Sequence, residues 1–205
     1  KIKHYGMRVS MHPGQYTVLN SENNEVASRA ADDLCYHAKV LDSLRLGPEH
    51  KIVLHVGGIY NNRKRSMERF ITNYKLLDDS IRSRLVIEND DNCYCIEDVL
   101  SIADKISIPV VYDYLHDITN PGPNKKSHVE WILACNKTWK KPDGVQKIHY
   151  SQQACGKSAG SHSETIDIDQ FLSFCNSIKD LEVDIMLEVK DKKLSAVKCI
   201  RAIKK

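Results

Sequence analysis

Short apolar runs alternate with longer amphipathic stretches along the chain. The short runs predict strands at residues 7–12, 52–55, 85–88, 110–113, 147–149 and 185–188. The stretches between them predict helices at residues 25–46, 66–83, 96–105, 125–140, 167–178 and 194–203. Ala27, Ala31 and Leu34 begin a series at spacings of four and three, typical of one buried helix face. Ser66 is expected to cap the second helix. Strands that alternate with helices indicate βαβ units and a parallel sheet.

Each predicted strand ends in a residue type that can bind a metal ion. These residues are His12, His55, Glu88, Asp113, His149 and Glu188. In a doubly wound sheet ligands gather at one switch point, whereas all strand ends of a TIM (β/α)₈ barrel converge on one mouth. So many contributing strands favour the barrel. We expect about six of its eight β/α units here, with the N-terminal units missing. No Gly/Ser-rich linker interrupts residues 1–205, which predicts a single partial-barrel domain.

Two further histidines extend this set of candidate ligands. His116 lies three residues after Asp113, and His162 lies in the segment after His149. A set that mixes His with carboxylates suits zinc, manganese or iron. It exceeds the needs of one ion, so we expect two or three. Such centres suit phosphate-ester hydrolysis, because the ions activate water and stabilise the attacking and leaving oxygens. A lone strand-end His is more often structural; the ordered series is what indicates a metal site.

The amino-acid composition excludes few classes of protein function. The formal net charge of +3 neither requires nor excludes a nucleic-acid partner. No apolar stretch approaches the roughly 18 residues that a membrane span needs, so no membrane partner is expected. The seven cysteines are odd in number and scattered, unlike a disulfide framework. We expect reduced thiols and an intracellular location.

Six ordered motifs occur along the chain. They are residues 8–16 (RVSMHPGQY), 55–58 (HVGG), 85–91 (LVIENDD), 113–116 (DYLH), 147–151 (KIHYS) and 186–190 (MLEVK). Together they resemble the UV damage endonuclease family from about residue 5 to the C-terminus. The resemblance implies a TIM barrel whose site is related to that of endonuclease IV. It also implies cleavage of damaged double-stranded DNA directly 5′ to a UV photolesion, which leaves a 3′-hydroxyl and a 5′-phosphate.

The resemblance also assigns roles at the metal site. It implies divalent ions, usually manganese, with zinc and magnesium as alternatives. One ion would be held by His12, His55 and Glu88. Glu88 would bridge to a second, and the ligands implied for the second and third ions are Asp113, His149, Glu188, His116 and His162. The residues implied to be catalytic are Glu88, Lys147 and Glu188. Lys147 matches a lysine that is carboxylated in the family; pairing with a substrate phosphate is the equal alternative. Asp117 departs from the family pattern, which often has a second His there.

The same resemblance implies a set of DNA contacts. Gln15 and Tyr16 match a pair that probes the duplex at the lesion, and an aromatic ring can replace lost stacking there. The other expected contacts are Asn20, Tyr60, Arg63, Lys64, Lys157 and Lys190, which follow strands and could reach phosphates. Two other functions remain open. One is a sugar isomerase or epimerase on a xylose-isomerase-like barrel, and the other is a catalytically impaired homologue that binds DNA or metal.

Overall fold

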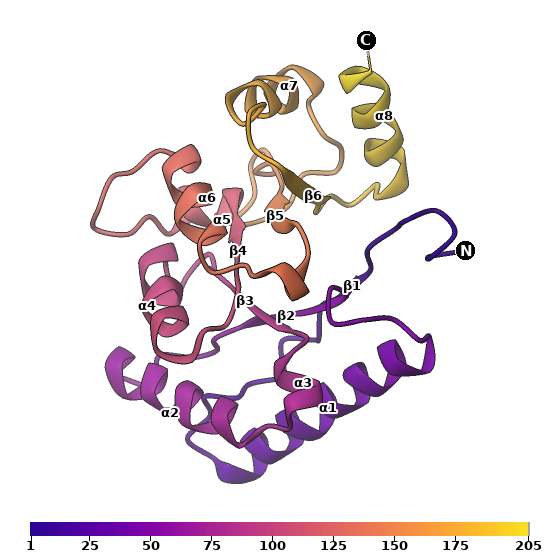
Figure 1. Ribbon diagram of the computed structural model, residues 1–205. Coiled ribbons are helices and arrows are strands. Elements are labelled where there is room, and N and C mark those ends of the chain that lie inside the picture. Colours follow the sequence, from indigo (N-terminus) through magenta and orange to yellow (C-terminus); the bar gives the residue numbers. More distant parts are fainter. Residues whose placement is uncertain (205) are drawn as a thin grey trace.

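The computed structural model describes residues 1–204 and contains one curled parallel sheet with helices on its outer side (Figure 1). The strands are β1 (Ser10–Met11), β2 (Lys51–His55), β3 (Leu85–Glu88), β4 (Val110–Asp113), β5 (Gln146–Tyr150) and β6 (Val183–Leu187). The helices are α1 (Asn24–Ser43), α2 (Arg63–Leu76), α3 (Asp79–Arg82), α4 (Ile96–Ile106), α5 (Tyr114–Thr119), α6 (His128–Asn136), α7 (Ile168–Ser177) and α8 (Lys193–Ile203), with a 3₁₀ turn at Lys141–Asp143.

The six strands follow one another in chain order and every neighbouring pair is parallel. The sheet bends far enough that a side chain beside one edge strand reaches the other edge strand. Arg8, just before β1, contacts Asp184 on β6, with Nη2 and Oδ2 2.7 Å apart. The residues described here therefore form a partial barrel, as the strand pattern predicted.

The strand predictions hold closely, and the helix predictions need several corrections, among them that the helix predicted at 125–140 is limited to His128–Asn136. β3 and β4 have the predicted limits, whereas β1 is shorter because residues before Arg8 form turns and Met7 is half exposed. The single helix predicted at 66–83 is two helices, because Leu77 adopts an extended backbone. Its cap is Asn62 rather than Ser66: Asn62 Oδ1 accepts a hydrogen bond from Arg65 N at 3.0 Å. Helix α5 was not predicted.

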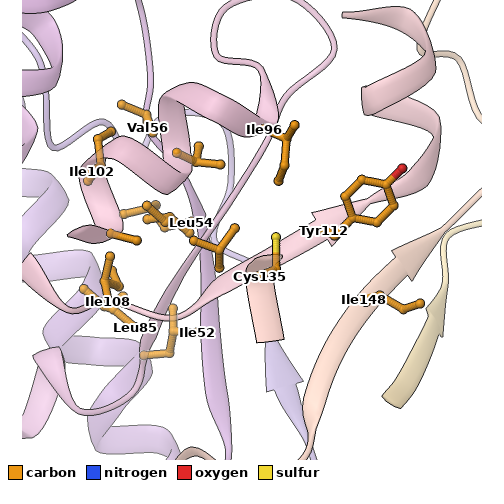
Figure 2. Packing of buried hydrophobic residues seen from close by; sticks show 14 of the residues in the cluster. Ile52, Leu54, Val56, Leu85, Ile96, Ile102, Ile108, Tyr112, Cys135 and Ile148 are labelled. Carbon is orange, nitrogen blue, oxygen red and sulfur yellow. The ribbon is translucent and has the colours of Figure 1, made fainter. Parts of the chain in front are cut away.

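Strands β2, β3 and β4 bury apolar side chains on both faces, as expected of a parallel sheet covered by helices. The outer face packs against the helices, and Figure 2 shows Ile52, Leu54 and Leu85 in this main core together with Ile102 of α4. The inner face holds a smaller cluster inside the barrel. It consists of Val53, Val86 and Val111, with Trp139 packed against them.

The inner cluster fixes where the polar strand ends point. Side chains alternate between the two faces of a strand, so residues two apart share a face. His55, Glu88 and Asp113 each lie two residues after one of the three inner valines. The sequence therefore directs all three into the barrel, one layer above its apolar floor. None of the helices within residues 1–204 has the length and apolarity that crossing a bilayer requires.

Candidate metal centre

The strand-end residues meet at the carboxyl ends of the strands. His55 is the register partner of Glu88, and Asp113 is the register partner of His149. His12 and Glu188 follow directly after β1 and β6. Pairing of adjacent strands thus places four of the six candidates side by side, and curling of the sheet brings the two edge residues to the same mouth.

Glu88 is the centre of this cluster. Its side chain is fully buried, and His12 Nε2 lies 3.3 Å from its Oε2. His55 Nε2 lies 3.9 Å from the same oxygen, and the two imidazole rings are 5.1 Å apart. These three residues form one group whose ligand atoms lie within 4.8 Å of one another.

Two more groups use the same carboxylate. His149 Nδ1 lies 3.0 Å from Glu88 Oε1 and 3.0 Å from Glu188 Oε1. His116 Nδ1 lies 3.6 Å from Glu88 Oε1 and 3.7 Å from Asp113 Oδ1. Because Glu88 belongs to all three groups, it can bridge ions that the histidines and other carboxylates hold separately.

His162 lies at the rim of the site. Its Nε2 is 3.7 Å from Glu188 Oε2, and its ring is 6.3 Å from the ring of His116. The structure thus brings together all eight predicted metal ligands, with His162 the most peripheral.

The charges of the site are strongly coupled. Burial alone would raise the pKa of Glu88, but the positive charge of His149, its hydrogen bond to Glu88 and the approach of His12 hold it well below its usual value. Burial would lower the pKa of His149, yet the carboxylates of Glu88 and Glu188 hold it well above its usual value. Burial dominates at Asp113 and raises its pKa. Protons on the imidazoles therefore balance part of the buried negative charge.

Several polar atoms here are buried without a hydrogen-bond partner among the described residues. They are Glu88 Oε2, Asp113 Oδ2, His55 Nδ1 and His149 Nε2. An unsatisfied buried acceptor destabilises a protein by about 1–3 kcal/mol. Carboxylate oxygens and imidazole nitrogens aimed into one space are the donor set of a transition-metal or zinc site. The residues present therefore fit divalent cations.

Lys147 lies below this cluster on the inner face of β5, two residues before His149. Only 3% of its surface is exposed. Burial, assisted by the positive charge of Arg8, lowers the pKa of Lys147 to about 8. Sequence reasoning placed Arg8 in a motif but gave it no role; its place directly before β1 was the available signal.

Asn89 is a second residue whose role the sequence did not reveal. Its Oδ1 accepts a hydrogen bond from Asp113 N at 2.8 Å, and its Nδ2 donates to Asp113 O at 3.1 Å. His116 Nδ1 lies 2.9 Å from the Asn89 carbonyl oxygen. Partners of this kind orient metal ligands. The available signal was an amide directly after a strand-end carboxylate.

The residues expected to contact DNA differ in accessibility. Gln15, Lys64 and Lys157 are exposed, and Tyr16 is 84% exposed. Lys190 is exposed and forms an ion pair with Glu164 at 2.8 Å.

Three others are engaged within the protein. Arg63 binds the Cys93 carbonyl and Asp98, although it keeps an exposed portion. Tyr60 is half-buried beneath the guanidinium of Arg69. Asn20 is fully buried, so its side chain does not lie on the surface where a direct DNA contact would form.

The chain is similar to known proteins over its whole length. The family model described as UV-endonuclease UvdE matches residues 1–205. The UV DNA damage endonuclease of Clostridium perfringens (strain 13 / Type A) is 47% identical over 204 residues, which are 99% of this chain and 49% of that protein. The crystal structure of SacUVDE superposes with a TM-score of 0.92 at 42% identity, over 99% of this chain and 67% of that one.

Endonuclease IV from Thermus thermophilus shares the fold more remotely. Its TM-score is 0.63 at 15% identity, over 97% of this chain and 77% of that one. The chain spans about half of the length of the Clostridium relative it matches. The match to SacUVDE confirms the predicted partial TIM barrel. With a family match over all residues and this level of identity, the chain belongs to the UV-endonuclease UvdE family.

Proposed function

We propose that this chain carries the active site of a metal-dependent endonuclease that nicks damaged double-stranded DNA. The nick would lie directly 5′ to a UV photolesion and leave a 3′-hydroxyl and a 5′-phosphate. The observation that carries the proposal is the single buried carboxylate of Glu88, shared by three ligand groups at the mouth of the barrel. Family membership supports the same substrate.

The three groups around Glu88 would hold two or three divalent ions. We propose that these ions are manganese. When bound, the ions would supply positive charge that stabilises the developing negative charge on the phosphate oxygens. The protein's own contribution is to fix this charge in place. Glu88 and His149 are almost fully buried, so their side chains are already fixed and need little reorganisation when a substrate binds.

Glu188 and Lys147 have different tasks in this proposal. Glu188 is partly exposed at the mouth, where its carboxylate, kept charged because the hydrogen bond from His149 lowers its pKa, would face the reacting phosphate together with an ion. Lys147 is too deeply buried to reach a DNA phosphate. Its lowered pKa supports the carboxylated form, because only the neutral amine adds to carbon dioxide, with release of a proton to solvent.

DNA would lie across the mouth. Gln15 and Tyr16 are exposed in the loop that follows His12, so we expect this ring and amide to meet the duplex near the first ligand group. An exposed aromatic ring stacks on a base without sequence preference. Lys64, Lys157, Lys190 and the exposed part of Arg63 would contact phosphates and would make binding salt-dependent.

The test is nicking of a duplex that contains one cyclobutane pyrimidine dimer, with manganese, by the wild-type chain and by Glu88→Gln. A nick directly 5′ to the dimer that only the wild type makes would support the endonuclease. Metal binding without a nick would contradict it and would favour a sugar epimerase or a DNA-binding homologue without activity. An undamaged duplex is the matched control substrate.

A further inference from the structure

A strained turn follows His55 at the end of β2. Within it the backbone angle φ is +111° at Gly57, +48° at Tyr60 and +60° at Asn61. Tyr rarely adopts such a value, although Asn does so more readily, and two in succession persist only where the surrounding structure holds them. Contacts from neighbouring segments must therefore stabilise this conformation of the loop that follows His55.

The buried side chain of Asn20 does so. Its Nδ2 donates a hydrogen bond to the Gly58 carbonyl at 2.7 Å, and the hydroxyl of Tyr94 donates to the same oxygen at 2.9 Å. Its Oδ1 faces Gly57, where a Cβ atom would lie only 2.3 Å away. Asn20 and Gly57 thus fit each other because Gly57 has no side chain.

Asn20 joins three loops that each follow a metal ligand. Asn20 itself lies in the loop after His12, Gly58 lies in the loop after His55, and Tyr94 lies in the loop after Glu88. His12, His55 and Glu88 are the members of one candidate ligand group.

Arg69 of helix α2 contacts both the Asn20 segment and the strained turn. Arg69 Nε donates to the Asn20 carbonyl at 2.9 Å, and its guanidinium lies 5.3 Å from the centre of the Tyr60 ring. In residues 1–204 the hydrogen bonds of the Asn20 side chain reach neither the loop after β5 nor the loop after β6.

We propose that Asn20 is a positioning residue that holds the loops after His12 and His55, keeps these two histidines in binding geometry and thereby sets the affinity of their group for a divalent cation. The inference rests on the proposed metal centre. The shared residue Glu88 is fixed by pairing of β3 with both neighbouring strands, so the effect of Asn20 should be confined to the ion that His12 and His55 hold.

The first experiment titrates the 205-residue chain with Mn²⁺ and follows each class of bound ion by calorimetry and electron paramagnetic resonance. Asn20→Ala should weaken one class by about 10-fold or more, the range found for partners that orient metal ligands, and leave the others unchanged. Asn73→Ala is the matched control. Asn73 Nδ2 donates to the Leu19 carbonyl at 2.6 Å, in the same segment but away from the turn. It should change affinity by less than about twofold, since it lacks such a link to the ligands.

A second variant separates positioning from loss of stability. Tyr94→Phe removes only a hydroxyl and should weaken the same ion to a smaller extent. In the metal-free protein, the ¹⁵N shifts of the His55 imidazole should change in Asn20→Ala and Tyr94→Phe but not in Asn73→Ala. Unchanged Mn²⁺ affinity in both test variants overturns the inference, and so does equal weakening of all ions in all three variants. A wild-type chain that binds no Mn²⁺ would overturn the proposed function, and the inference with it.

Discussion

The inner strands and the edge strands of the sheet hold their ligands in different ways. Every residue of β3 is buried, whereas every residue of β6 is only half-buried. Glu88 and His149, on inner strands, have side chains that are 0% and 2% exposed, whereas His55, on β2 beyond the last residue that β1 pairs with, is 35% exposed. His12, after the edge strand β1, is 36% exposed. Pairing on both sides fixes the inner ligands, and the edge ligands need additional support.

The two edges obtain that support differently. Glu188 N donates to Tyr150 O at 3.0 Å, which continues the ladder between β5 and β6 by one residue. His12 follows a strand of two residues and lies in a loop that Asn20 ties to its neighbours. His12, which has fewer sheet contacts than Glu188, is the ligand whose loop is held by a buried side chain, that of Asn20.

The largest effect should come from removal of the shared inner carboxylate. Glu88→Gln should weaken Mn²⁺ binding by more than about 100-fold, because loss of a partner outside the ligand shell already costs roughly 10- to 100-fold. Glu188→Gln, at the edge, should weaken fewer ions and by less. Titration of both variants with Mn²⁺ checks this order. Equal losses would mean that inner and edge ligands are equivalent.

A second effect should appear in the free energy of unfolding. Ile87→Ala on β3 removes a fully buried side chain and should lower the free energy of unfolding by about 2–5 kcal/mol. Ile185→Ala on β6 makes the same chemical change at a half-buried position, where less apolar surface returns to water on truncation. Its effect should be less than half as large. Urea denaturation of the metal-free variants measures both, and a larger loss for Ile185→Ala would refute the distinction.

The smallest effect should be a pH dependence at the β1 edge. His50 Nδ1 accepts a hydrogen bond from Val9 N at 2.9 Å, and burial lowers the pKa of His50. Between that lowered pKa and the usual 6.5, the unfolded chain binds more protons than the folded one. Stability contributed by His50 should therefore be present above pH 6.5 and fall as the pH decreases below it.

Hydrogen exchange of the Val9 amide checks this dependence. Exchange, corrected for its intrinsic pH dependence, should show loss of protection on acidification, and His50→Gln should remove the pH dependence. Protection that increases on acidification would contradict the assigned direction.

The sequence predicted the inner strands better than anything else. The limits of β3 and β4 followed from apolar runs that end in a carboxylate, and burial on both faces leaves such runs little freedom. The position of His55, Glu88 and Asp113 at the ends of parallel strands predicted that they would converge. These features depend on local pattern, which a single sequence contains.

Features that depend on contacts between distant segments were not predictable in the same way. The break at Leu77 has no proline or glycine to mark it. Asn20 lies in a polar segment typical of an exposed loop, and only the approach of Gly58 and Tyr94 buries it. Arg8 meets Asp184 only because the sheet curls. Each of these roles comes from the way loops and sheet ends assemble.

The alternation that points the ligands inward also makes the site intolerant of shifts in strand register. A slip of β3 by one residue would turn Glu88 toward the helices and Ile87 into the barrel. A slip by two would keep the facing but move the carboxylate along the barrel axis by about 6.6 Å. A ligand that still faces the barrel interior can therefore move along the barrel axis only in steps that are longer than a metal–ligand bond. Insertions and deletions that preserve function should be confined to the loops, and a strand that folds in the wrong register cannot bind the ions even weakly.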